Sequence, residues 1–389
     1  MTRVACVADC HIGPHQVFGG PSRLGLNARC WESVEVLKRA VAVANAERAE
    51  TLLVVGDLFD SDRPSPQLIH AVRLALAKFR GGVILVRGNH DARSDDPRDN
   101  ALHAACPQDG WVIDRVETAF PHDHGQVLAA YPSTAAPMRE AVPAWLRTLT
   151  TGLAVFHAGL ETKGTPHFLK GGSHAVPLDA VADAVRSTPS IDVVLCGDWH
   201  EHQIHHVTRL RPDDGYGPRR APTEEQVPII QIGSLCPTGF DDLSPVHGVV
   251  MVDLPGAPIP ASVTVHPIPG PRFIKAVEPS RALWDRIACL GVAGEATAIY
   301  LSLHPTTPEG VREARAACER YSMMLAGWRV VPDVKATVAK ARAQARSVAA
   351  APTLEAALAH YVGAVQAQPA GVAPAEVLAA CHGHLARPA

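Results

Sequence analysis

The chain contains 389 residues, of which 47% are hydrophobic, and its formal net charge is −3. This length suits two or more domains of about 100–200 residues each, and the apolar fraction suits a globular protein with a large core. The near-neutral charge excludes a protein that coats nucleic acid through a basic surface, so any nucleic-acid contact must depend on local patches or bound metal ions.

Membrane proteins and disulfide-rich proteins are also disfavoured as classes. No run approaches the ~18 consecutive apolar residues of a membrane span, and the chain enters a predicted strand at Arg3 without a signal-peptide pattern. The nine cysteines form no C-x-x-C pair, and a chain of this size can build a core without disulfides. We therefore expect reduced thiols in a cytoplasmic protein that has no membrane association.

The first part of the chain alternates predicted strands with predicted helices. Ser65 precedes Pro66, which is the order of a helix cap followed by a first helical residue. The resulting βαβαβ order predicts an α/β fold with a mainly parallel sheet and right-handed crossovers. The expected elements are strand Val4–Ala8, a helix over roughly Arg29–Ala49, strand Thr51–Val55, a helix from Pro66 to about Phe79, and strand Val83–Val86.

Strands and helices continue through the middle of the chain. The stretch Arg211–Gln226 is dense in proline, glycine and charge, which predicts an exposed loop. The other expected elements are strands near Val127–Ala130, Leu153–Phe156, Val193–Cys196, Ile229–Ile232 and Val249–Leu254, and helices over Met138–Leu149 and Leu178–Arg186.

The composition changes after the proline-rich segment Pro255–Pro271. A smaller α/β unit is expected there, with strand Ala298–Leu303, a helix over Pro308–Tyr321 and strand Trp328–Val331. From about Ala336 the chain is rich in alanine and helical in pattern. We therefore expect a first domain over residues 1–268, a small α/β domain over 269–334, and a helical C-terminal segment over 335–389.

Metal-binding residue types follow five of the apolar runs. In an open α/β sheet, ligands bind beyond the carboxyl ends of the strands, so these side chains should converge on one rim. A lone Asp is more often a turn former and a lone His more often a satisfied core residue, but the joint order of D-x-H, G-D-x-x-D, G-N-H-D, His and G-D-x-H is specific. The residues are Asp9, His11, Asp57, Asn89, His157, Asp198 and His200.

This set suits two divalent cations, which two-metal phosphoesterases hold about 3.5–4 Å apart to acidify a water and offset phosphoryl charge. Asp57 can bridge because a carboxylate has two oxygens. His90 is placed to act as the general acid on the leaving oxygen, and Asp60 or Asp91 can orient it, although a salt bridge or a cap explains either equally well. The first ion would take Asp9, His11, Asp57 and His200, and the second Asp57, Asn89, His157 and Asp198.

These motifs resemble the calcineurin-like metallophosphoesterase superfamily. Five segments resemble the SbcD branch of this superfamily, a branch of DNA-repair nuclease subunits. They are VADCHIG, VVGDLFDSDRPSP, VILVRGNHDA, VLCGDWHEHQ and IIQIGSLCPTGFDD. The resemblance covers 3–254 well, 272–331 weakly and the C-terminus least.

The resemblance implies a β-sandwich flanked by helices, a small α/β capping domain and a helical tail that grips an SbcC-like coiled-coil ATPase. It also implies Mn²⁺ as the metal, with Mg²⁺ or Fe as alternatives, together with a DNA substrate and a homodimer. The apolar stripe of Leu354, Leu358, Tyr361 and Val365 is the pattern expected of such a docking tail.

One position departs from the pattern, because the superfamily carries G-H-x-H where this chain has Asp198 in place of the first His. Aspartate is a competent ligand for a hard ion, but it adds a negative charge that can alter metal preference. A rival alignment pairs His200 with His202, so His202 stays an alternative ligand.

Three functions remain compatible with the sequence. The leading one is a metal-dependent DNA nuclease, favoured by the G-D-L-F-D text, the capping unit and the tail. The others are a phosphatase or cyclic-nucleotide phosphodiesterase, and a scaffold with a degenerate site. The nuclease hypothesis includes both exonuclease and endonuclease cleavage of DNA.

Overall fold

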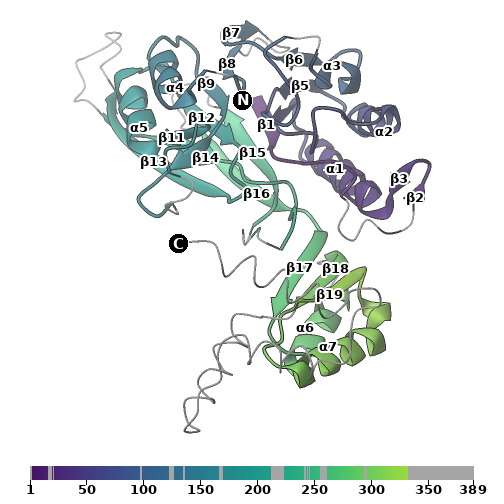
Figure 1. Cartoon of the computed structure of the whole chain (residues 1–389). Coiled ribbons are helices and arrows are strands. Elements are labelled where there is room, and N and C mark those ends of the chain that lie inside the picture. The colour runs from purple at the N-terminus through teal and green to yellow at the C-terminus, as the bar shows by residue number, and fades with distance from the viewer. Residues whose placement is uncertain are drawn as a thin grey trace, which may run out of the picture. The chain divides into compact units, whose positions relative to one another are not determined.

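The computed structural model describes residues 2–15, 20, 22–96, 99–121, 127–134, 136–165, 170–211, 223–240, 242, 244, 246–254, 261–292 and 296–331 (Figure 1). The chain divides into two compact units, the first covering Met1–Arg272 with Glu295–Thr297 and the second covering Phe273–Gly294 with Ala298–Ala389. The helical tail expected over 335–389 lies outside the described residues.

The first unit contains a sheet with the strand order β16-β15-β1-β4-β5-β6. Strands β1, β4, β5 and β6 run parallel, while β15 pairs antiparallel with β1 and β16 pairs antiparallel with β15. The expected βαβαβ order is therefore confirmed. The sheet is mixed because β15, which comes much later in the sequence, pairs antiparallel with β1. The strands are β1 (Thr2–Val7), β4 (Thr51–Val55), β5 (Gly82–Val86), β6 (Trp111–Ile113), β15 (Gly248–Leu254) and β16 (Ser262–Pro267).

Two helices connect the first strands and begin at side-chain caps. Helix α1 (Ala28–Ala46) begins after Asn27, whose side chain accepts a hydrogen bond from the Cys30 N–H. Helix α2 (Pro66–Leu76) begins after Ser65, which accepts from the Leu68 N–H, as its sequence predicted. Both helices pack on one face of the sheet, where apolar side chains of β1, β4, β5 and β15 form a common core with them.

A second sheet in the same unit has the order β13-β14-β12-β9-β8-β7. Helices α4 (Met138–Leu146) and α5 (Leu178–Ser187) pack on its outer face. The short helix α3 (Leu102–Ala105), the hairpin β2 (Ser22–Arg23) and β3 (Leu26–Asn27), and the pair β10 (Gly159–Glu161) and β11 (Ala175–Pro177) complete the unit. The strands are β7 (Glu117–Pro121), β8 (Val127–Tyr131), β9 (Leu153–His157), β12 (Val193–Gly197), β13 (Gln203–Arg211) and β14 (Thr223–Gln231).

The exposed loop expected over Arg211–Gln226 needs a correction. Strand β13 includes Arg211 and strand β14 includes Thr223–Gln226, and the two pair antiparallel from Gln203 with Gln231 to Arg211 with Thr223. Proline, glycine and charged residues are frequent in the turns of such hairpins. The predicted loop was therefore too long, and it included the ends of both flanking strands. Residues 212–222 lie outside the described part of the chain.

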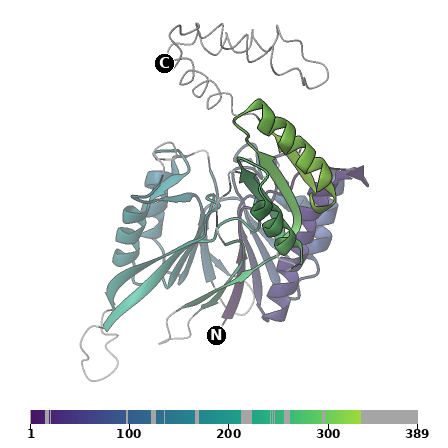
Figure 2. The ribbon, with the colours of Figure 1, turned by 90° about the horizontal axis from the view of Figure 1, so that it is seen from below.

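The two sheets face each other across a shared apolar layer. Along β4, Leu53 and Val55 point into this layer and Leu52 and Val54 point to the helices, which is the alternation of a pleated strand. Strands β9 and β12 contribute Val155 and other residues from the opposite sheet. Figure 2 shows the helices of this unit outside and its sheets between them. The expected β-sandwich flanked by helices is thus observed, and both sheets carry their parallel strands to the same rim.

The second unit is a small α/β fold. Its sheet has the order β17-β18-β19, and β18 and β19 are parallel. Trp284 stacks on Tyr321 with ring centroids 4.3 Å apart. No helix of the described residues is long and apolar enough to cross a membrane. The elements are β17 (Gly270–Ala276), α6 (Arg281–Val292), β18 (Ala296–Leu303), α7 (Pro308–Arg320), a 3₁₀ helix (Ser322–Met324) and β19 (Gly327–Val330).

Candidate metal centre

The strand ends turn sharply at the residues that carry the predicted ligands. Among the described residues, six that are not glycine have positive φ, and Asp9, His11, Asp57 and Asp198 account for four of them, at 48°, 41°, 49° and 86°. This conformation costs energy for residues with a Cβ and is concentrated at functional sites. The loops are held together by backbone hydrogen bonds from Asp9 to Gly56 O and from His11 to Asp57 O, at 3.2 and 3.0 Å.

Two glycines of the motifs are required by close packing against the site. A Cβ on Gly88 would lie 2.1 Å from Asp57 Oδ1, and a Cβ on Gly56 would lie 1.9 Å from His157 Nδ1. Gly56 also has a φ of +78°, which favours glycine. The G-D and G-N pairs of the sequence therefore reflect the close approach of the loops to the ligand side chains.

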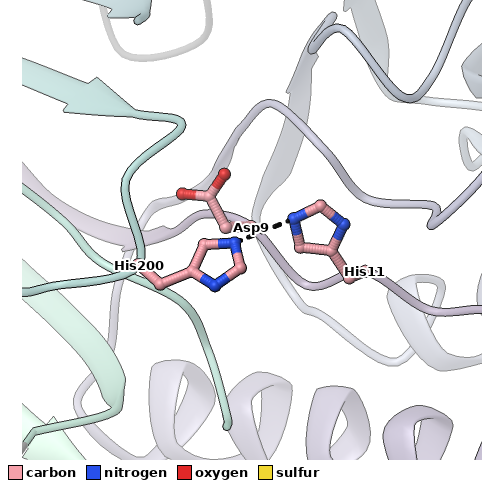
Figure 3. A group of neighbouring side chains, drawn as sticks. All are labelled: Asp9, His11 and His200. Carbon is pink, nitrogen blue, oxygen red and sulfur yellow. Dashed lines mark hydrogen bonds between the residues drawn. The ribbon is translucent and has the colours of Figure 1, made fainter. Parts of the chain in front are cut away.

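Asp9, His11 and His200 form the first group of side chains (Figure 3), with ligand atoms within 4.8 Å of one another. The Nε2 atoms of His11 and His200 lie 3.1 Å apart. Their Nδ1 atoms face carboxylates, at 3.5 Å from Asp60 Oδ1 and 3.4 Å from Asp242 Oδ2. An ionised carboxylate only accepts, so each Nδ1 carries the hydrogen and the two Nε2 lone pairs face each other. This arrangement fits a cation that both nitrogens bind.

His157 is the centre of a second group, which includes Asp57 and Asp9. Its Nδ1 lies 2.9 Å from Val55 O and therefore donates to that carbonyl. Its Nε2 then presents a lone pair, yet it faces Asn89 Oδ1 at 3.0 Å, Asp57 Oδ2 at 3.4 Å and Asp198 Oδ1 at 3.8 Å. With His157 neutral, four acceptor atoms converge, and this set fits a bound cation. Burial alone would lower the pKa of His157, but Asp57 and the other carboxylates around it raise that pKa, so without an ion the ring can take up a proton and donate to Asp57.

Asp57 lies between the two groups. Its Oδ2 is 3.7 Å from His11 Nε2 in the first group and 3.4 Å from His157 Nε2 in the second. Its Oδ1 accepts the His90 backbone N–H at 2.8 Å. A carboxylate held in this position has one oxygen within reach of the ligands on both sides, as a bridging ligand requires.

The ionisation of these groups reflects burial and crowding of like charges. Burial raises the pKa of Asp9 to about 6, and the nearby Asp57 carboxylate adds to this effect. Burial, together with Asp57, also raises the pKa of Asp198. For Asp57 itself burial acts in the same direction, but the imidazoles of His157 and His11 outweigh it and lower its pKa. A divalent cation would relieve the repulsion among these carboxylates.

His90 lies at the edge of the centre, with its side chain 43% exposed. Its Nδ1 is 3.2 Å from the Asp60 backbone carbonyl, and its Nε2 is 4.0 Å from Asp57 Oδ2. Asp60 thus contacts His90 through its carbonyl, while its carboxylate faces His11. The buried Asp91 accepts from the backbone N–H groups of Phe59 and Gly88, so these contacts tie the two loops together.

Three other residues lie near the centre: His202, which the sequence proposed as an alternative ligand, and Asp242 and Thr238, which it did not identify. His202 has its Nδ1 3.0 Å from Ile232 O and belongs to none of the metal-binding groups found among the described residues. Sequence reasoning assigned no role to Asp242 or Thr238, although both contact His200 Nδ1. They follow it by about forty positions on a separate loop, and only their place in the TGFDD text marked them.

The calcineurin-like phosphoesterase family matches residues 2–202, and the chain belongs to this family. This agrees with the resemblance carried by the motifs. The chain is a metal-dependent phosphoesterase, a hydrolase of a family that uses two metal ions, and the Asp and His groups described above are consistent with such a centre.

Individual proteins similar to this chain include SbcD, the D component of the nuclease SbcCD of Rhodobacter capsulatus, which is 26% identical over 383 residues, covering 84% of this chain and 86% of the relative. Among solved structures, a dimetal phosphatase from Danio rerio is 13% identical, with 65% of this chain and 92% of that chain covered and a TM-score of 0.39. The nuclease MPE of Pseudomonas putida is 16% identical, with coverage of 64% and 83% and a TM-score of 0.26.

Proposed function

We propose that this chain is the DNA-cutting subunit of an SbcCD-like complex, a phosphodiesterase with two metal ions. One observation carries the proposal: the likeness to the SbcD relative covers 84% of the chain, which is more than the 2–202 segment matched by the phosphoesterase family. A general phosphoesterase relationship needs only the catalytic segment. The additional coverage favours the function of SbcD over that of other members of the family.

In this proposal the first ion is held by Asp9, His11, Asp57 and His200. When bound, the two ions supply Lewis-acid stabilisation of the phosphoryl oxygens and lower the pKa of a coordinated water. The chain's own residues hold the ions and keep bulk water away from these ligands, since Asp9 and His157 are fully buried. The second ion is assigned to Asp57, Asn89, His157 and Asp198.

We assign His90 the role of general acid. It is partly exposed and its Nδ1 faces the Asp60 carbonyl, so its Nε2 is directed toward the centre and can deliver a proton to the leaving oxygen. Asp60 positions His90 through this carbonyl, and Asp91 positions the loop that carries His90.

Mn²⁺ is the proposed metal, with Mg²⁺ or Fe as alternatives. The proposed second-ion ligands include two carboxylates and an amide, which are hard oxygen donors, and a single imidazole. Hard oxygen donors favour Mg²⁺ and Mn²⁺, and imidazole tolerates Mn²⁺ and Fe²⁺ better than Mg²⁺.

The proposed partners are DNA, an SbcC-like coiled-coil ATPase and a second copy of this chain. We also propose a cytoplasmic location, because the eight cysteines in the described part of the chain are free thiols and six of them are buried. Residues 269–334 are proposed as the capping domain and 335–389 as the docking segment for the ATPase.

Deleting the residues after Pro332 should leave hydrolysis of small phosphodiesters intact and abolish co-purification with the ATPase. Retained co-purification, or insolubility of the truncated chain, would contradict the docking role.

The nuclease proposal is tested by comparing substrates under one set of conditions. Purified protein with Mn²⁺ is assayed on linear duplex DNA, on bis-p-nitrophenyl phosphate, on p-nitrophenyl phosphate and on cyclic nucleotides, with Asp57→Ala as the inactive control. Cleavage of DNA and the diester by the wild type, with no cleavage by Asp57→Ala, supports the nuclease. A preference for the monoester or for cyclic nucleotides favours a phosphatase or cyclic-nucleotide phosphodiesterase, and inactivity on every substrate with any metal favours the scaffold.

A further inference from the structure

The carboxylate of Asp242 is buried beside the metal centre without being one of its predicted ligands. Its side chain is 2% exposed. Asp242 Oδ2 lies 3.4 Å from His200 Nδ1 and accepts hydrogen bonds from the Thr238 N–H and the Ser234 hydroxyl, each at 3.2 Å. The other oxygen, Oδ1, accepts from the Ser244 N–H at 3.3 Å. Both oxygens are therefore fixed by donors from the loop that follows β14.

The surroundings of Asp242 hold its side chain in one orientation. The Thr238 carbonyl accepts a hydrogen bond from the Arg29 guanidinium, which ties the loop to the start of α1. His247 is also buried, and its Nδ1 lies 3.0 Å from the Ser234 hydroxyl and 3.1 Å from the Ser234 carbonyl. Ser234 therefore connects His247 to Asp242 and does not present its hydroxyl to a substrate phosphate in this arrangement.

Two groups face His200 Nδ1, the Asp242 carboxylate at 3.4 Å and the Thr238 hydroxyl at 3.3 Å, and that hydroxyl can donate to Asp242 Oδ2 at 3.5 Å. A carboxylate opposite Nδ1 favours the tautomer with hydrogen on Nδ1, which leaves a lone pair on Nε2. That lone pair is directed at His11 Nε2, 3.1 Å away. A His200 with hydrogen on Nε2 could not serve as a ligand at this position.

We infer that Asp242 is a positioning residue for the first metal ion, holding His200 by its Nδ1–H so that Nε2 is free to bind the ion. The inference depends on the metal centre of the proposed function. Asp242 acts through His200 and does not itself touch the ion or the substrate. Asp60 has the corresponding position at His11 Nδ1, at 3.5 Å, but its side chain is 40% exposed.

The test removes the negative charge of Asp242 and measures metal binding directly. An amide at this position must place its NH₂ against donors from Thr238 and Ser234 or from Ser244, so Asp242→Asn cannot reproduce the pattern. Loss of such an outer partner typically weakens metal affinity by about 10–100-fold. We expect this loss for Mn²⁺ by titration calorimetry, with Asp242→Asn still folded by circular dichroism.

A matched control is available in the same unit. Asp114 has a side chain that is 10% exposed, and it accepts a 2.7 Å hydrogen bond from His103 Nε2. Neither residue belongs to the metal-binding groups found in the described part of the chain. Asp114→Asn breaks a carboxylate–imidazole pair of the same kind and should leave Mn²⁺ affinity unchanged.

A second measurement is made on the wild-type protein, where a variant serves only to assign signals. In metal-free wild-type protein labelled with ¹⁵N-histidine, His200 should show a protonated Nδ1 and an unprotonated Nε2, with its signals assigned by their absence from His200→Gln. Hydrogen on Nε2 in the wild type, or Mn²⁺ affinity in Asp242→Asn equal to that of the wild type, would overturn the inference. If the wild type binds no divalent ion, the metal centre of the proposed function fails, and a His200 tautomer that is the same in the wild type and in Asp242→Asn would still overturn the inference that Asp242 sets the state of His200.

Discussion

The two sides of the metal centre use different chemistry, although the same series of motifs builds both. On one side the Nε2 atoms of His11 and His200 face each other, and a carboxylate lies behind each ring. On the other side one imidazole, His157, is held by a backbone carbonyl and surrounded by three side-chain oxygens. The first side is rich in nitrogen and the second is rich in oxygen, so we expect the two ions to be held with different preferences.

The oxygen-rich side owes much of its character to Asp198. Its backbone N–H donates to both oxygens of Asp9 at 3.0 Å, which couples the end of β12 to the end of β1. Its carboxylate then adds charge beside Asp57. Burial raises the pKa values of both Asp9 and Asp198, and the nearby Asp57 carboxylate adds to this effect for each of them. The departure from the family pattern therefore falls on the side where a harder ion would compensate for it.

The largest expected effect comes from removing the residue shared by both sides. Asp57→Ala should lose both ions, because the carboxylate lies between the two groups. A loss of several kcal/mol of transition-state stabilisation corresponds to on the order of a 10³-fold or greater loss of activity. Hydrolysis of bis-p-nitrophenyl phosphate and metal content by mass spectrometry measure the effect, with the exposed Asp183→Asn on α5 as the control. Full activity of Asp57→Ala in metal-free buffer would refute a two-ion centre.

A smaller effect should follow from His90→Asn, which tests whether His90 belongs to either side. As a general acid outside the ligand set, it should contribute about 10²–10⁴-fold to turnover while both ions stay bound. His90 can also be grouped with His11 and Asp57 as a third set of neighbouring donors, so the assignment is open to direct contradiction. A fall in metal stoichiometry in His90→Asn would make it a ligand.

The sequence predicted the fold of the first unit because its signals are local. Apolar runs identified the strands, Ser65 identified the start of α2, and the carboxyl ends of the strands placed the predicted ligands on one rim. Strand β13 and the first part of β14, Thr223–Pro228, were missed because exposed positions and charge interrupt their apolar pattern, while the strand predicted at Ile229–Ile232 falls on the end of β14. Asp242 was missed because its contact with His200 joins segments that are distant in sequence, and a single chain offers no signal for that pairing.

An intermediate effect is expected from restoring the family residue on the oxygen-rich side. Asp198→His replaces a hard carboxylate with imidazole, which suits Zn²⁺ better than Mn²⁺. We expect the ratio of Zn²⁺ to Mn²⁺ affinity to rise by about tenfold, or ~1.4 kcal/mol. Competition calorimetry measures the ratio, and Asp198→Asn separates the loss of charge from the gain of nitrogen. An unchanged ratio in Asp198→His would mean that Asp198 does not contact an ion.

The smallest effect concerns the surroundings of the nitrogen-rich side. Burial, with a contribution from Arg29, lowers the pKa of His15 to about 4 from a usual value of 6.5. Its Nδ1 lies 4.0 Å from Asp60, the carboxylate behind His11. Because the folded pKa is below the unfolded one, the unfolded chain binds more protons between these values, and stability falls as the pH drops from 6.5 toward 4.

This shift corresponds to a loss of about 1 kcal/mol in the free energy of unfolding between about pH 7.5 and 5.5. His15→Gln has no titrating ring, so its unfolding midpoint in denaturant should depend less on pH by that amount, measured on metal-free protein. An equal pH dependence in both proteins would show that His15 is accessible to protons in the folded state. The nitrogen-rich side would then be more accessible to water than the burial of His15 suggests. Its preference for a particular metal ion would differ less from that of the oxygen-rich side.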